Sequence, residues 1–172
     1  MSMVSKIIGT AVAIALIAQY LGLLVKLRVV EQKVGPFRFY FRDVDPLKAS
    51  HMSASLEIRL LLRRAGVRDC HAFSIVPHEL YAQSRTSKFG WVVPGKHRRD
   101  LDGLPGVGVQ YLPVSECMVV EFPRGGVFAS AVGLMRARRA LARHRSTHGY
   151  QNSDIYVERF ASKTLFAQPI RR

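Results

Sequence analysis

The sequence is poor in cysteine. Its 172 residues include two, Cys70 and Cys117, which lie far apart and form no CxxC or Cys/His ligand spacing. This scarcity argues against a disulfide framework and against a cysteine-based zinc site, and it fits a reducing compartment. Each cysteine stands in or beside an apolar run, which is typical of a small core residue.

Acidic residues are also few. Asp and Glu number 12 against 26 Lys and Arg, which gives a formal net charge of +14. Such a chain favours anionic neighbours, whether nucleic acid, a lipid surface or an acidic protein, and charge alone does not choose among them. No RNA-binding aromatic motif accompanies the basic residues, which argues against nucleic acid as the partner.

Catalytic motifs are lacking as well. The sequence contains no GxSxG, HExxH, P-loop or GxGxxG pattern. His144 and His148 are four residues apart and share a helix face, a spacing that permits metal binding. No cysteine or carboxylate flanks them in the sequence, so we expect solvated cations near a helix C-terminus. The sequence therefore predicts no metal, no cofactor and a non-enzymatic protein.

The longest uncharged stretch is apolar. Ile7–Val25 spans nineteen residues, or about 28 Å as a helix, close to the thickness of a bilayer's hydrocarbon core. We expect a lumenal N-terminus over residues 1–6, a transmembrane signal-anchor over 7–26 and a spacer over 27–33. A cleaved signal peptide and an apolar core helix are the alternatives. Basic residues after the stretch place the C-terminal side in the cytosol.

The remainder, residues 34–172, shows one order of elements twice. Apolar residues make up 48% of the whole chain, which is enough for a packed core. Residues 34–95 and 116–172 each read as strand, helix, strand, strand. The predicted strands are 34–44, 72–76, 89–95, 109–112, 116–123, 154–160 and 163–170, and the predicted helices are 53–66 and 127–149. This duplicated β-α-β-β pattern indicates an α+β fold, with an antiparallel-rich sheet and two helices on one face. The other face would be an open groove.

Three segments resemble the GyrI-like small-molecule-binding domain, an SHS2-type fold. They are the corner VVEFPRGG (119–126), the helix end HGY (148–150) and the closing hairpin DIYVERF…KTLFAQPI (154–170). An anchor ahead of such a domain is similar to the testis-expressed ER-phagy receptor family, which implies the endoplasmic reticulum and a cytosolic domain. Those receptors carry a long acidic disordered tail, which this chain does not show after its last predicted strand.

A cationic or polar ligand in the groove would need an acid among aromatic side chains. Glu158 alternates with Tyr156, so both should point to the same face of the sheet. The candidate ligand-binding residues are Glu158, Tyr156, Glu121, Trp91 and Phe39. In the alternative interpretation Tyr156 and Trp91 are ordinary sheet residues, and Glu158 is a solvated partner of Arg159 or Arg171.

The second predicted helix is rich in arginine. Arg136, Arg139 and Arg143 follow three- and four-residue spacing and share one face. On a membrane-tethered domain this face would contact anionic lipid, with about 1 kcal/mol from each residue. RNA phosphates are a second partner of the same charge. A solvated helix face is the alternative.

The leading interpretation is a single-pass membrane protein whose cytosolic GyrI-like domain binds a small molecule or a protein partner without catalysis. One alternative is a membrane-tethered adaptor for organelle turnover, as in ER-phagy. Another is a basic protein that contacts lipid or RNA. A third is a GyrI-like hydrolase of small molecules, in which Glu121 or Glu158 acts as the base.

Overall fold

Eight antiparallel strands and three helices make up the described part of the chain. The structure, a computed structural model, describes residues 3–20, 23, 25–44, 51–78, 87–94, 103, 106–123 and 127–172. In chain order the elements are α1 (Met3–Tyr20), β1 (Val29–Val34), β2 (Phe37–Val44), α2 (His51–Arg64), β3 (His71–Val76), β4 (Ser87–Pro94), β5 (Gly108–Leu112), β6 (Ser115–Phe122), α3 (Val127–His148), β7 (Ile155–Arg159) and β8 (Thr164–Pro169). The glycines of the expected corner before α3 lie outside the described residues.

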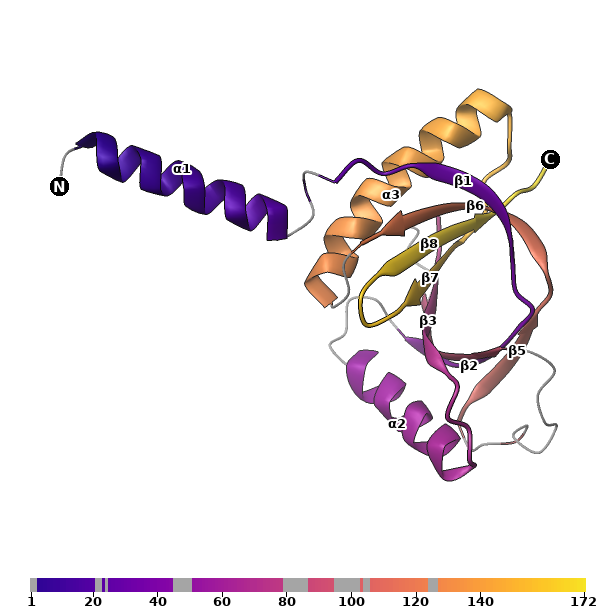
Figure 1. Cartoon of the computed structure of the whole chain (residues 1–172). Helices are drawn as coiled ribbons and strands as arrows, with labels where there is room; N and C mark the ends of the chain where they lie inside the picture. Colours follow the sequence, from indigo (N-terminus) through magenta and orange to yellow (C-terminus); the bar gives the residue numbers. More distant parts are fainter. Residues whose placement is uncertain are drawn as a thin grey trace.

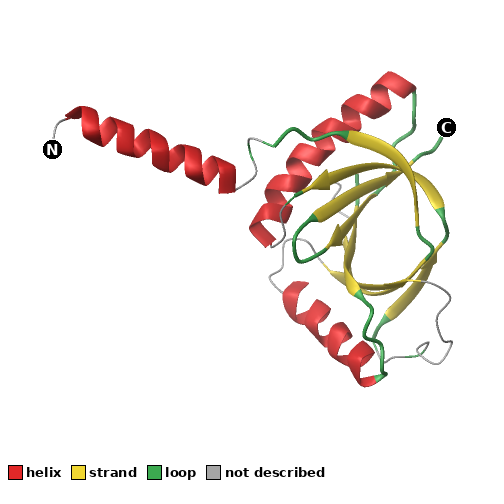
Figure 2. Ribbon diagram, viewed as in Figure 1, coloured by secondary structure: helices red, strands yellow, loops and turns green. Residues whose placement is uncertain are grey.

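The strands form a sheet in the order β1-β6-β8-β7-β3-β4-β2-β5. Figure 1 shows that the sheet curls strongly, with α2 and α3 outside it, and Figure 2 shows the strands enclosing a concave inner side. The α+β class, the antiparallel sheet and the placement of both helices on one face, all expected from the sequence, are confirmed.

Two four-stranded halves meet where β3 pairs with β7. The predicted strand-helix-strand-strand order is confirmed in each half, as β2-α2-β3-β4 and β6-α3-β7-β8. Each half receives its outermost strand from the other half of the sequence, because β1 pairs with β6 and β5 pairs with β2. This exchange ties the two halves together at both edges of the sheet as well as at its centre.

The spacer predicted over residues 27–33 is wrong, because Val29–Val34 forms β1. This strand pairs with β6 from Val29↔Val120 to Val34↔Ser115. Its four central residues are exposed, so the strand has no alternation of buried and exposed positions that a sequence pattern could reveal. Backbone hydrogen bonds to β6, rather than a buried face, therefore hold this edge strand in the sheet. A hydrophobicity pattern in the sequence does not show such backbone pairing.

The convex side is covered by the apolar stripes of the two helices. In α3, Ala137 and Leu141 are fully buried over the second half of the sheet. In α2, Ile58 and Leu62 are fully buried against Tyr40 of β2 and its neighbours. Burial of these side chains, at roughly 1.5–3 kcal/mol for each large aliphatic one, holds the helices to the sheet.

Helix α1 lies apart from the sheet (Figure 1), and its Ile7 and Ile8 are 60% and 59% exposed. Within the described residues, α1 covers the predicted apolar run from Ile7 to Tyr20. In the described part of the chain no helix is long and apolar enough to cross a membrane. The transmembrane anchor expected over residues 7–26 is therefore not supported.

The curl of the first half depends on a glycine in β4. Gly90 pairs with Phe41 of β2, and a Cβ atom placed on Gly90 would lie 1.8 Å from the carbonyl oxygen of Tyr40. On the other side of β2, a Cβ on Gly108 would lie 2.8 Å from the ring of Phe41. Both positions lack a side chain because the backbone of β2 and the ring of Phe41 fill the space.

We expect Gly90→Ala to lower the free energy of unfolding by about 3 kcal/mol or more, because the added methyl overlaps a backbone oxygen that cannot rotate away. Urea denaturation of the full chain measures this change. Gly9→Ala in α1 is the matched control: a Cβ there has nothing within 4 Å, and the change should be neutral or stabilising by up to about 1 kcal/mol. A Gly90→Ala protein as stable as the wild type would contradict the close approach.

Candidate ligand-binding site

Aromatic side chains fill the concave side of the first half of the sheet. Phe39 and Phe41 of β2 stack with ring centroids 5.2 Å apart, and Phe73 of β3 packs edge-on to Phe39 at 4.9 Å. Phe37 adds a further edge contact to Phe73 at 6.0 Å. These separations are in the favourable range for aromatic pairs. Phe39, a predicted wall of an open groove, is fully buried inside this cluster.

Glu158 of β7 lies at the end of the aromatic cluster. It pairs in register with Phe73, and its carboxylate contacts Nε2 of His71, two residues earlier on β3. The imidazole of His71 stacks on Phe160 at 4.9 Å and stands edge-on to Phe37 at 6.2 Å. The side chains of Glu158 and His71 are 11% and 19% exposed. A nearly buried carboxylate is thus paired with an imidazole among aromatic rings.

Tyr156 connects the two halves of the concave side. It lies on the same face as Glu158, as the alternation along β7 requires, and its ring centroid is 5.6 Å from that of Phe73. It also packs against the apolar group formed by Cys117, Val119 and Ala167 in the second half. Burial raises the pKa of the Tyr156 hydroxyl, so the side chain is neutral at physiological pH.

Trp91 does not line the concave side, and its predicted place in a ligand groove is wrong. Its indole Nε1 donates a hydrogen bond to the carbonyl oxygen of Ser55 in α2, at 2.7 Å. The guanidinium of Arg59, also in α2, lies 4.8 Å from the ring centroid. The alternation of β4 places Trp91 on the convex side with Val93, whereas the sequence shows the alternation but not which face is concave.

Glu121 of β6 lies on the concave side two strands away from Glu158, because both pair in register with Leu165 of β8. Its carboxylate is 54% exposed and accepts a hydrogen bond from Nζ of Lys163 at 2.9 Å. A cavity of about 470 Å³ opens beside it. The cavity is lined by Val25, Lys26, Arg28, Val30, Gln32, Val119, Glu121, Pro123, Lys163 and Leu165.

A smaller cavity, of about 210 Å³, is lined in part by Tyr156. One of its lining residues, Lys88, places its ammonium nitrogen 4.4 Å from the ring centroid of Phe41 and donates to Oε1 of Gln110 at 2.9 Å. On the concave side, the ammonium group of Lys88 therefore already lies over the ring of Phe41. Cation–π attraction of this kind contributes about 0.5–2 kcal/mol.

The three arginines predicted to share a face of α3 have different surroundings. Arg136 donates through Nη2 to the carbonyl oxygen of Val25, so it holds the segment that leads into β1. Arg139 and Arg143 are exposed, and Nε of Arg143 bonds the carbonyl oxygen of Arg139 at 3.3 Å. Their contact with an anionic surface stays a prediction.

His71 was not among the predicted site residues. In the sequence His71 and Glu158 are 87 positions apart, and their contact depends on the pairing of β3 with β7. The pattern HAFSIV contains a usable signal, since its alternation places His71, Phe73 and Ile75 on one face. Without the strand order, nothing in the sequence relates that face to Glu158.

Comparisons with known proteins identify the fold. No protein-family model and no curated protein matches the sequence. Among solved structures, EcmrR in its DNA complex matches with a TM-score of 0.65 at 12% identity, over 98% of this chain and 68% of that one. The EcmrR C-terminal domain matches with a TM-score of 0.64 at 12% identity, over 85% and 98%. SAV2435 bound to tetraphenylphosphonium matches with a TM-score of 0.55 at 10% identity, over 84% and 94%.

These matches support the GyrI-like α+β fold expected from the sequence. One of these neighbours, SAV2435, has tetraphenylphosphonium bound. The match to EcmrR in its DNA complex covers 98% of this chain, so it extends into α1. The match to the isolated C-terminal domain covers 85% of this chain. The comparisons offer no support for the resemblance to ER-phagy receptors.

Cys117 provides a test of how closely the concave side is packed. It is fully buried, and burial raises the pKa of its thiol to about 11. At pH 8 roughly one thiol in a thousand would be ionised. In a Cys70→Ser protein, we therefore expect iodoacetamide to alkylate Cys117 at least about a hundredfold more slowly in the folded protein than in the protein unfolded in urea. Mass spectrometry follows the reaction. Equal rates in both states would show that the concave side is open to the reagent.

Proposed function

We propose that this domain binds a small, hydrophobic, positively charged molecule on the concave side of its sheet, next to Glu158. The observation that carries the proposal is the pairing of the Glu158 carboxylate with His71 inside an aromatic cluster. A carboxylate at 11% exposure has lost most of its hydration, so it needs a positive or hydrogen-bonding partner. In the ligand-free protein that partner is His71, and a bound cation would take over part of this role.

The surroundings of Glu158 favour a ligand that is apolar apart from its charge. The faces of Phe37, Phe73 and Phe160 are attractive to a cation and provide apolar contact area. The chain carries a net charge of +14, which repels cations at long range. At physiological salt that repulsion is screened beyond about 8 Å, so the local carboxylate decides the interaction. Tetraphenylphosphonium, bound in the SAV2435 structure, has this chemistry.

The binding of a ligand without catalysis is part of the proposal. The hydrolase alternative needs a carboxylate able to accept a proton from water. Both candidate carboxylates are already engaged by a neighbouring side chain, Glu158 by His71 and Glu121 by Lys163. Residence at the endoplasmic reticulum with a cytosolic domain, and the adaptor role, stay predictions.

We expect the full chain to bind tetraphenylphosphonium, and we expect Glu158→Gln to weaken binding by at least about tenfold. The substitution keeps the shape of the side chain but removes its charge, and a hydrogen bond or contact to a charged group contributes about 1.5–3 kcal/mol. Isothermal titration calorimetry measures the dissociation constant. Glu121→Gln is the matched control, because it removes a carboxylate of the same face beside the larger cavity. Loss of binding in Glu121→Gln alone would move the site to that cavity and contradict the assignment to Glu158.

His71 should compete with the ligand for Glu158. We expect His71→Leu to lower the melting temperature, because it leaves the buried carboxylate unpaired. The same change should tighten tetraphenylphosphonium binding by about tenfold, since the ligand no longer displaces a partner. His71→Gln, which keeps a hydrogen-bond donor, should lie between the wild type and His71→Leu in both measurements. A parallel fall in stability and affinity would mean that His71 helps to hold the ligand instead.

A further inference from the structure

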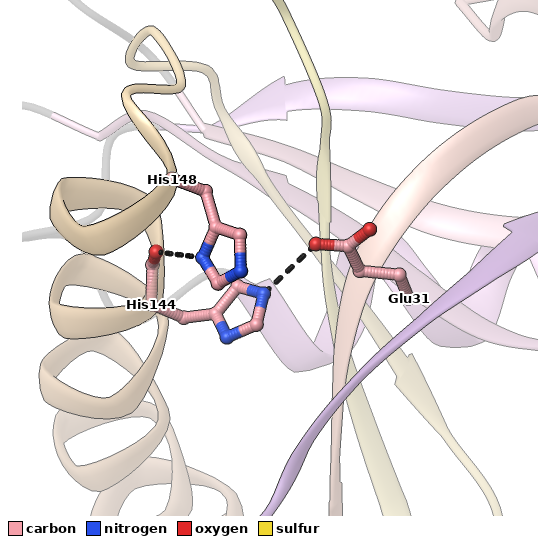
Figure 3. A group of neighbouring side chains, drawn as sticks. All are labelled: Glu31, His144 and His148. Carbon is pink, nitrogen blue, oxygen red and sulfur yellow. Dashed lines mark hydrogen bonds and ion pairs between the residues drawn. The ribbon is translucent and has the colours of Figure 1, made fainter.

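Three side chains with metal-ligating atoms meet where the edge strand β1 passes the last turns of α3. They are Glu31 of β1 and His144 and His148 of α3, drawn in Figure 3. Nε2 of His144 lies 2.9 Å from Oε1 of Glu31, and the two imidazole rings stack with centroids 4.1 Å apart. One ligand atom from each of the three side chains falls within 4.8 Å of the other two.

Neighbouring groups orient these side chains. Nδ1 of His148 donates to the carbonyl oxygen of His144 at 2.8 Å, which leaves Nε2 of His148 as the acceptor nitrogen of the neutral ring. The hydroxyl of Tyr150 donates to Oε1 of Glu31 at 3.1 Å. In metal sites, a histidine commonly donates its other N–H to a carbonyl, and a ligating carboxylate accepts a hydrogen bond of this kind. Figure 3 shows both imidazoles projecting from α3 toward Glu31.

The donor set selects a class of metal. Two imidazoles and one carboxylate suit Zn²⁺ and its first-row neighbours, whereas Ca²⁺ and Mg²⁺ prefer oxygen ligands. Bonds of about 2.0–2.1 Å in a tetrahedron place ligand atoms roughly 3.3 Å apart. The present separations, up to 4.8 Å, therefore need a movement of about 1.5 Å at most by side chains that are exposed or half-buried. Three protein ligands leave a coordination position for water.

We propose that Glu31, His144 and His148 form a binding site for Zn²⁺ or a similar divalent transition metal, which fastens β1 to α3. The site lies on the convex side of the second half, separate from the concave side that carries Glu158, so the proposal is independent of the ligand proposed there. It also revises the expectation from the sequence that the two histidines are solvated cations without a carboxylate nearby. Glu31 is 113 residues from His144, and only the pairing of β1 with β6 brings it there.

Fastening β1 has a structural consequence. This strand is the edge of the sheet and has four exposed central residues, so backbone pairing and a few contacts to α3 hold it in place. A metal that binds the folded arrangement and not the unfolded chain raises stability by mass action. In its absence, the hydrogen bonds from His144 and Tyr150 to Glu31 form a weaker connection between the same elements.

The test uses the full chain without a histidine tag. Zn²⁺ is titrated in competition with a chromophoric chelator, Co²⁺ absorption reports the coordination geometry, and the melting temperature is followed with each metal. We expect one metal per chain and a melting temperature that rises with metal concentration. His148→Ala and Glu31→Gln should each weaken Zn²⁺ binding by at least about tenfold, and Tyr150→Phe should weaken it less.

Glu116→Gln is the matched control, because Glu116 is an exposed carboxylate on the adjacent strand β6 that forms an ion pair with Arg172 at 3.8 Å. It should leave Zn²⁺ binding unchanged. Circular dichroism of each variant without metal checks that the fold is kept. Absence of one-to-one binding in the wild type, or equal binding in the wild type, His148→Ala and Glu31→Gln, would overturn the proposal.

Discussion

The antiparallel pairing of β3 with β7 is the contact on which the rest of the domain depends. Among the described strands, this pairing joins the two four-stranded halves of the sheet. The same pairing sets Phe73 opposite Glu158, and therefore brings His71 to the carboxylate. A shift of one residue in this register would turn Glu158 to the convex side and break the aromatic contacts of Tyr156. Architecture and candidate site thus share one determinant.

The exchange of outer strands strengthens this arrangement. Because β1 completes the second half and β5 the first, neither half has its full set of four strands without a segment from the other half of the sequence. On the convex side each helix packs on the strands of its own half, and the cluster under α3 also includes Val76 of β3. Strand pairing therefore joins the two halves, and the packing of Val76 in the cluster under α3 adds to this connection.

These two kinds of interaction explain what the sequence could predict. The helices, β2 through β8, the doubled element order and the common face of Tyr156 and Glu158 follow from periodicity, which reports burial within one segment. Strand β1 was not predicted, because its central residues are exposed. Trp91 was assigned to the wrong face of the sheet, because the alternation along a strand does not show which face is concave. His71 and Glu31 acquire their partners through pairings across 87 and 113 residues, which no local pattern contains.

The contact between Glu158 and His71 on the concave side is difficult to explain as a source of stability. Replacing a buried charged pair by apolar side chains of similar volume is often neutral or stabilising, because the pair must be desolvated. The neighbours of Glu158 and His71 include Phe37, Phe73 and Phe160, so an apolar pair would fit these surroundings well. A carboxylate kept in such a place favours occupants that carry positive charge and disfavours neutral or anionic ones, which gain nothing for the desolvation they cause. Selectivity for the ligand proposed here would account for Glu158 better than stability does.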